Sequence, residues 1–162
     1  TCEVQPVGWL LVWDATFLPE DQDLVFGDQE EMGFGVRVAT PLSEKRGGII
    51  TNASGLKTAK ATWGQPAQWC DYSGKLENEP VGITLLAHPN NFRASWWHNR
   101  DYGILVANPF GQAAMKQGEP SSVRVERDKP LRLVFGAMIH NGSAYDPQLA
   151  FKQFLNAVRE IK

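Results

Sequence analysis

Short apolar runs, separated by turn-forming residues, most constrain what this chain can fold into. Fifteen glycines and ten prolines interrupt the 162 residues, and these two residue types are the strongest local breaks in regular structure. Many runs between them alternate, as in GFGVRVAT, where Phe34, Val36 and Val38 share one face and Arg37 lies on the other. Alternation with a period of two indicates a strand with one buried face. The predicted strands span 7–16, 24–27, 33–40, 48–51, 62–72, 81–88, 102–108, 121–127 and 131–140.

One helix is predicted, near the C-terminal end of the chain. Asp146 can cap it, and Pro147 suits its first turn. Apolar residues then recur at helical spacing at Ala150, Phe154, Leu155, Val158 and Ile161. Closely spaced strands without helices between them predict one all-β domain over 1–162, an antiparallel β-sandwich, alone or as part of a larger supersandwich. We expect the helix to close an open edge or end of this sandwich.

Charge and hydropathy exclude several classes of partner. The net charge is -2 and the isoelectric point is near 5.9. Nucleic acids and anionic membranes attract proteins with a basic excess, so neither is expected as a partner. No apolar run approaches the roughly 20 residues of a membrane-spanning helix. The remaining class of partner is a small-molecule or saccharide ligand.

The start of the chain and its two cysteines bear on its origin. The sequence opens TCEVQPVGW, without Met, so we expect either a processed start or a longer polypeptide whose N-terminal remainder is then a partner. Cys2 and Cys70 either form one disulfide, as an exported protein would allow, or remain buried free thiols.

The first candidate site is FGDQEEMGFGVRV, residues 26 to 38. If the strand runs back from Arg37, then Glu31, Gly33, Gly35 and Arg37 share one face. At roughly 3.3 Å per residue, the acid and the base would lie about 20 Å apart, on either side of bare backbone. The glycines then form either the floor of a ligand groove or a tight crossing inside the sheet.

The second candidate site is HPNNFRASWWHNRDYG, residues 88 to 103. Pro89 and the two asparagines after it end a strand, which leaves His88 at a strand tip, where sandwiches carry sites. If residues 98–102 are extended, His98, Arg100 and Tyr102 share a face and provide a proton shuttle, an oxygen clamp and a hydroxyl donor. The predicted catalytic residues are His98, Glu31 and His88, and the predicted substrate-binding residues are Arg37, Arg93, Trp97, Arg100 and Tyr102. The alternative is that the same residues form a polar seam between two sheets.

Three further groups of residues could form a site. The stretch TWGQPAQWCDYSG adds Trp63, Trp69, Asp71 and Tyr72, which suit either a ligand cleft or a sandwich core. Glu30 or Glu31 with Asp101 could form the carboxylate pair of a glycoside hydrolase. The distance between the two carboxyl groups decides whether such a pair can act in this way. His88 and His98, with His140 or Glu31, match no compact ligand spacing, so neither a metal nor another cofactor is predicted.

An ordered series of motifs resembles a known bacterial family. The motifs are FGDQEEMGFGVRVATPLS, GGIITNASG, WGQPAQWCDYSG, GITLLAHPNNFR, WWHNRDYGILVANPFG and LRLVFGAMIHNG, from about Asp23 to Gly142. They resemble the methane oxygenase PmoA-like family, whose function is unknown and whose members are longer, so the chain is expected to be the C-terminal half to two-thirds of one. The true methane monooxygenase subunit of that name spans the membrane several times, so the family name does not imply its activity.

The resemblance also implies a direction for the function. Members of that family occur in bacteria rich in polysaccharide degradation, often with export signals, so a periplasmic or secreted location is expected. The implied fold is similar to the large sandwiches of aldose epimerases, in which histidines and a carboxylate open sugar rings, and His88, His98 and Glu31 would be the analogous residues here.

The leading functional hypothesis is a domain that binds or processes a carbohydrate or polyol in a His/Arg/Trp-lined cleft. If it is an enzyme, His98 would shuttle the proton, Glu31 would be its partner carboxylate, and Arg37 and Arg100 would hold the substrate oxygens. The first alternative is a non-catalytic binding or structural module. The second is a metal-dependent oxygenase, as the family name suggests.

Overall fold

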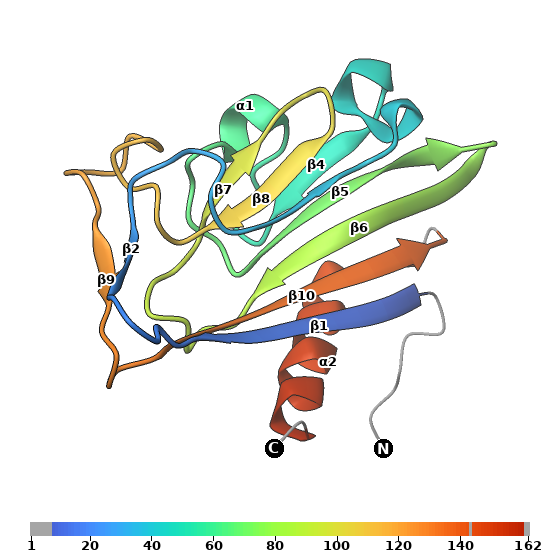
Figure 1. The fold of residues 1–162 in the computed structure, drawn as a ribbon. Helices are drawn as coiled ribbons and strands as arrows, with labels where there is room; N and C mark the ends of the chain where they lie inside the picture. Colours follow the sequence, from blue (N-terminus) through green and yellow to red (C-terminus); the bar gives the residue numbers. More distant parts are fainter. Residues whose placement is uncertain (1–7, 143, 161–162) are drawn as a thin grey trace.

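The structure, a computed structural model, describes residues 8–142 and 144–160. Three antiparallel sheets account for its strands. The largest sheet has the order β1 (Gly8–Phe17), β10 (Leu131–Asn141), β6 (Glu79–Ala87), β5 (Trp69–Leu76) and β4 (Ile49–Asn52). The second sheet has the order β3 (Phe34–Arg37), β8 (Ile104–Asn108) and β7 (Trp96–Asn99), and β2 (Leu24–Phe26) pairs with β9 (Val123–Val125). The second sheet lies over one face of the first (Figure 1), which confirms the predicted all-β antiparallel sandwich.

The core between the sheets follows from the alternation of side chains. Phe135 of β10 is fully buried, and the rings of Trp13 and Phe34 pack on it at centroid distances of 5.9 and 5.5 Å. Phe34 and Val36 of β3 point into this core, whereas Arg37 is exposed, as the GFGVRVAT pattern predicts. The inner face of the sandwich is therefore set by residues two apart on each strand.

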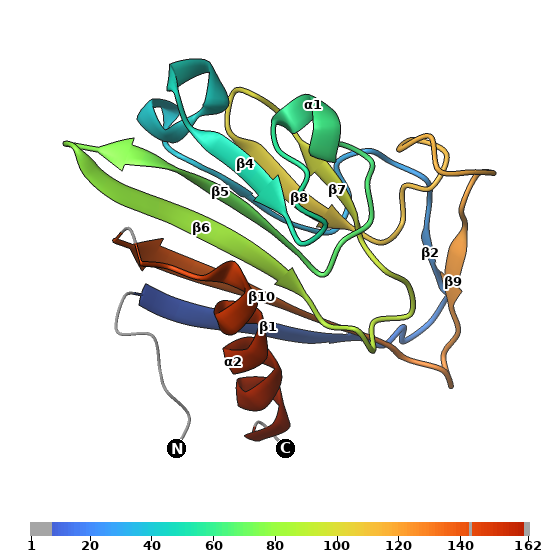
Figure 2. The same cartoon turned by 180° about the vertical axis from the view of Figure 1, so that it is seen from behind.

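The C-terminal helix α2 (Pro147–Glu160) packs on the opposite, outer face of the five-stranded sheet (Figure 2). Its buried residues contact Trp69, Leu86, Val134 and Met138. Gly136 permits the close approach, because a Cβ there would lie 2.8 Å from the ring of Phe154. The prediction that the helix closes an edge or end of the sandwich is wrong. Val134 and Met138, on the outward face of β10, are apolar, so the helix is needed to bury them.

The helix begins as predicted. Asp146 precedes Pro147, and its carboxylate accepts the backbone N–H of Gln148 at 2.8 Å. This bond satisfies one of the amide groups that a helix start leaves without an intrahelical partner.

One predicted strand and one segment expected to be extended differ in the structure. Residues 62–72 contain the end of a short helix, α1 (Ala59–Thr62), then a turn at Gly64, and the strand starts only at Trp69. Residues 98–102 are not extended throughout, because β7 ends at Asn99 and Gly103, with a φ of 110°, closes a turn back into β8. Glycine in this left-handed region is what permits the turn.

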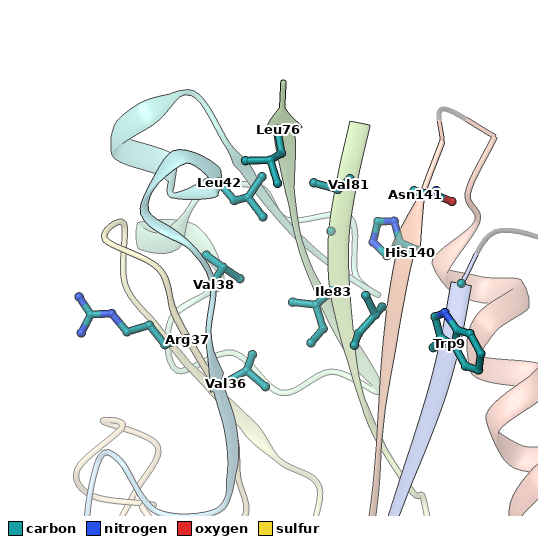
Figure 3. Close-up of a pocket in the computed structure, with 13 residues that line it drawn as sticks. Trp9, Val36, Arg37, Val38, Leu42, Leu76, Val81, Ile83, His140 and Asn141 are labelled. Carbon is teal, nitrogen blue, oxygen red and sulfur yellow. The ribbon is translucent and has the colours of Figure 1, made fainter. Parts of the chain in front are cut away.

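Part of the inner face of the large sheet lies in an open apolar groove of about 680 Å3. Val38, Leu42 and Ile83 converge in it from different elements, whereas Arg37 points away (Figure 3). Trp9 on the edge strand β1 is 81% exposed. The groove therefore presents aliphatic side chains to solvent next to a strand that pairs, within 8–142 and 144–160, with β10 alone.

Replacing Phe154 tests the role of α2. Phe154→Ala removes a fully buried ring between α2 and the sheet, and we expect unfolding free energy to fall by about 3–5 kcal/mol in urea denaturation. Lys152→Ala, on the exposed side of the same helix, is the control and should change it by less than about 0.5 kcal/mol. Equal, small effects of both changes would contradict the packing described.

Candidate functional site

Two adjacent acids lie on a loop that is braced by a buried asparagine. Glu30 and Glu31 form a turn between β2 and β3. The side-chain amide of Asn108, at the end of β8, donates to the carbonyl oxygens of Gln29 (2.7 Å) and Glu30 (2.9 Å). Its oxygen accepts the N–H groups of the two residues at 110 and 111, at 2.9 Å each. Because Asn108 is fully buried, these bonds fix the backbone that carries both carboxylates.

A second brace joins the same loop to residues 111–121. The carboxylate of Asp28 accepts the backbone N–H groups of Ala113 (2.9 Å), Ala114 (2.8 Å) and Ser121 (2.6 Å). Burial opposes ionisation of this carboxyl, but the three hydrogen bonds together hold the pKa of Asp28 below its usual value. The loop that follows β8 is thereby anchored to the segment that bears the acids.

His98 lies behind the two acids. Its side chain is completely buried in β7, with Nδ1 3.4 Å from Oε1 of Glu30 and Nε2 3.7 Å from Oε1 of Glu31. Neither ring nitrogen makes a hydrogen bond of normal geometry within the described residues. Burial first, and then the positive charge of Arg100, lower the pKa of His98 against the opposing charges of the two acids. The imidazole is therefore neutral at pH 7.

Trp63 and Arg100 complete the group. The indole N–H of Trp63 donates to Oε1 of Glu30 at 3.1 Å, and Nη2 of Arg100 donates to the same oxygen. The guanidinium carbon of Arg100 lies 5.7 Å from the centre of the Trp63 ring. We call these five residues, Glu30, Glu31, Trp63, His98 and Arg100, the acid–base cluster.

The acid–base cluster borders a hollow of about 640 Å3. Its charged lining consists of Glu30, Glu44, Lys60, Arg100, Asp101 and Lys116. Glu31 is not among the lining residues, but its side chain is 70% exposed and so can reach a ligand. The arrangement provides a solvent-accessible acid, a planar cation and an aromatic ring around one concavity.

The model of a protein family matches residues 1–154, nearly the whole chain. The chain belongs to DUF6807, a family of unknown function. The prediction of a family of unknown function is confirmed, and the match carries no statement about methane oxygenase. No curated protein and no solved structure matches this DUF6807 chain.

Three of the predicted site residues meet in the DUF6807 structure. Glu31 and His98 lie side by side, and Arg100 joins them through Glu30. They do so for a different reason from the one predicted: β3 does not extend back to Glu31, because Gly33 adopts a φ of 131°. A Cβ at Gly33 would lie 2.1 Å from the carbonyl oxygen of Ala107. Of the two interpretations of the glycines, the tight crossing within the sheet is the observed one.

The other predicted site residues lie elsewhere. His88 follows β6 and meets the edge of the Phe154 ring, 6.0 Å between centroids, under α2. Arg37 stacks on the exposed ring of Tyr102, with its guanidinium carbon 5.6 Å from the ring centre. These residues belong to the groove side and the helix side of the molecule, so the predicted cleft with all of them is wrong.

Arg93 and Trp97 have structural partners. Nη1 of Arg93 donates to the hydroxyl of Ser121 at 2.9 Å, and its guanidinium carbon lies 5.5 Å from the Trp96 ring centre. Trp97 is completely buried, and its indole N–H donates to the carbonyl of Ala67 at 3.1 Å. Trp97 is therefore inaccessible to a ligand, and Arg93 is held by its structural partners at a half-buried position.

Sequence reasoning missed the central place of Glu30 and Trp63. The sequence offers Glu30 for a carboxylate pair and Trp63 as part of an aromatic stretch, but nothing in their spacing links them across 33 positions. Lys116 also lies near the ring of Trp63, with Nζ 5.8 Å from its centre, and carried no sequence signal.

A polar seam does occur, but on the outer face of the large sheet. Oδ1 of Asp71 accepts a hydrogen bond from Thr84 at 2.6 Å and lies 2.8 Å from Nε2 of His140. The ring of Tyr145 stacks on that of His140 at 3.5 Å. Gly82 makes room for the imidazole, since a Cβ there would be 2.6 Å from it. This seam ties the segment before α2 to the strands.

The described part of this DUF6807 chain contains neither a group of metal-ligating side chains nor a membrane-spanning helix. His88, His98 and His140 occupy three separate environments, and no three of the His, Cys, Asp and Glu residues within 8–142 and 144–160 are grouped as metal ligands would be. None of the helices there has the length and apolar character needed to cross a bilayer. Cys70 is a buried free thiol, and Cys2 lies outside the described residues.

The lowered pKa of His98 predicts a pH dependence of stability. Above about pH 6.5, His98 is neutral in both the folded and the unfolded chain; below it, the unfolded chain takes up a proton that the folded chain resists. Stability should therefore fall as the pH decreases from 7 towards 5, and the lowered pKa of His88 acts in the same direction. The midpoints of urea unfolding, recorded between pH 7 and pH 5, measure this loss of stability. His98→Asn should make the midpoint depend less steeply on pH. An unchanged slope in that variant would contradict the assignment.

The brace at Asn108 predicts a large cost for its removal. Asn108→Ala leaves two carbonyls and two N–H groups without their partner in a buried place, so unfolding free energy should fall by about 2–4 kcal/mol. Asn90→Ala, at an exposed position, serves as the matched control in thermal and urea unfolding. A loss no greater than that of the control would show that the brace is dispensable.

Proposed function

We propose that the acid–base cluster binds a carbohydrate or a related polyol and exchanges protons with its hydroxyl groups. One observation carries the proposal: the carboxylate of Glu30 and the partly exposed guanidinium of Arg100 line one hollow, and the buried neutral imidazole of His98 and the exposed carboxylate of Glu31 lie next to them. Carboxylates and guanidinium groups bind hydroxyl oxygens and hydrogens with defined geometry. The neighbouring Trp63 ring offers an apolar surface to the C–H groups of a sugar.

The residues of the cluster have distinct roles in this proposal. Glu31 is the general base that meets a ligand hydroxyl, because it is the most exposed of the titratable groups. His98 lies directly behind it, with Nε2 3.7 Å from Oε1 of Glu31, and relays the proton rather than storing it, because burial disfavours the charged imidazole. Glu30 orients Trp63 and Arg100 through its shared oxygen.

The resemblance to the PmoA-like family supports a carbohydrate as the ligand. The analogy with aldose epimerases changes in detail, since His88 is not part of the cluster and a second carboxylate, Glu30, takes its place beside His98. The proposal includes a periplasmic or secreted location, which would bring the chain into contact with oligosaccharides.

A binding module without turnover is the second candidate. The complete burial of His98 favours it, because a ring with no exposed nitrogen reaches a ligand only through a carboxylate. In that case the imidazole fixes the acids, and the site binds sugar without proton transfer.

Titration of the purified chain with a panel of oligosaccharides, followed by calorimetry and NMR, tests the site. Arg100→Ala should weaken binding at least tenfold, while Arg124→Ala, whose partner is Asp23 on the surface, should leave it unchanged. The fold of each variant is checked by its circular dichroism. Equal affinity of wild type and Arg100→Ala would remove the hollow from consideration.

A second measurement separates catalysis from binding alone. Exchange of anomeric signals of a bound sugar reports proton transfer, and Glu31→Gln should abolish the exchange with a change in affinity of less than about threefold. Binding without exchange in the wild type would favour the non-catalytic module.

A further inference from the structure

The charges around the hollow are unequally compensated. Two acids of the lining have cationic partners: Glu30 binds Arg100, and Asp101 lies 3.5 Å from Lys45. The third, Glu44, accepts the neutral backbone N–H of Ala59 at 2.6 Å. The two lysines of the lining, Lys60 and Lys116, are exposed and form no ion pair with a residue of 8–142 or 144–160. Among the described residues that line this concavity, two ammonium groups therefore stand without an ion pair against one carboxylate, that of Glu44.

Lys116 is held in its place by a costly backbone conformation. Its φ is 58°, in the left-handed region, which costs a residue with a Cβ about 1 kcal/mol or more. The surrounding loop enforces it: the N–H of Lys116 donates to the carbonyl of Ala113 at 2.9 Å, and Asp28 binds the N–H groups of Ala113 and Ala114. Glycine would fit this position without strain, yet the chain places a cation there.

The position of Lys116 relates it to the acid–base cluster. Its Nζ lies 5.8 Å from the centre of the Trp63 ring, which Arg100 also approaches at 5.7 Å. Lys60 reaches the same hollow from α1. Two cations, one on a helix and one on a loop, thus line the hollow that contains the ring proposed to receive the sugar.

We infer that the ligand of this hollow is an acidic sugar, of the uronic acid class, whose carboxylate binds between Lys60 and Lys116 while its hydroxyl groups meet Glu31 and Arg100. The inference rests on the proposed function and specifies its substrate class. A carboxylate compensates the two ammonium groups, whereas a neutral sugar leaves them hydrated and unpaired.

Matched sugars test the inference. Oligomers of galacturonate and of galactose differ in the carboxylate, and calorimetry should show galacturonate binding at least tenfold more tightly. The preference should weaken when salt is raised from about 0.05 to 0.5 M, since exposed ion pairs are screened. Galactose binding should respond little to salt.

Variants assign the preference to the lysines. Lys60→Gln with Lys116→Asn removes both charges, and Asn tolerates the left-handed backbone. This double variant should bind both sugars with equal affinity, and Lys57→Gln, at an exposed position outside the lining, should keep the full preference.

The outcomes distinguish the two proposals. Equal binding of both sugars by the wild type, or a preference that survives in the double variant, would overturn the acidic-sugar inference and leave the polyol site standing. Failure to bind either sugar, together with no response of any ligand in the panel to Arg100→Ala, would overturn the proposed function itself.

Discussion

The burial of the large sheet on both of its faces is the constraint on which the rest of the structure depends. Strand β10 pairs with β1 on one side and with β6 on the other. Its alternate residues divide between two cores, with Phe135 turned towards the second sheet and Val134 and Met138 turned towards α2. From 133 to 139 the strand is apolar on both faces, which holds the helix and the second sheet in fixed places.

The acid–base cluster depends on this frame through a few buried polar groups. The acids come from the β2–β3 loop, the imidazole from β7 and the guanidinium from the turn after it, so no single element carries the site. Asn108 and Asp28 fix the first of these pieces, the β2–β3 loop, to β8 and the segment after it with hydrogen bonds to backbone atoms. A functional group positioned in this way keeps its geometry without contacting a ligand. The cost is a set of buried polar atoms that must all stay paired.

The sequence predicted the strands well where apolar and polar residues clearly alternate. It predicted them poorly where the backbone conformation of a glycine determines whether the chain extends or turns. GFGVRVAT alternates, and Phe34 and Val36 face the core as expected. The same stretch could not show that Gly33 turns the chain, because both strand and turn accept glycine. The helix was recognised from its period, but the face that it covers depends on Gly136, whose missing side chain has meaning only once Phe154 lies above it. Likewise, Glu31, His98 and Arg100 could be named as polar residues, but the contact of Glu30 with Trp63 joins positions 33 apart, and only the fold creates it.

The free side of β1 gives the architecture an open end. Within the described residues, the backbone groups along that side have no strand beside them, and Trp9 stands on the neighbouring apolar surface. Further strands could add there without breaking an existing ladder, and each would lengthen the hydrophobic interior already begun by the sandwich. The five-stranded sheet can thus be extended at its β1 edge. At its opposite edge, β4, the 53–58 turn already bonds to the strand.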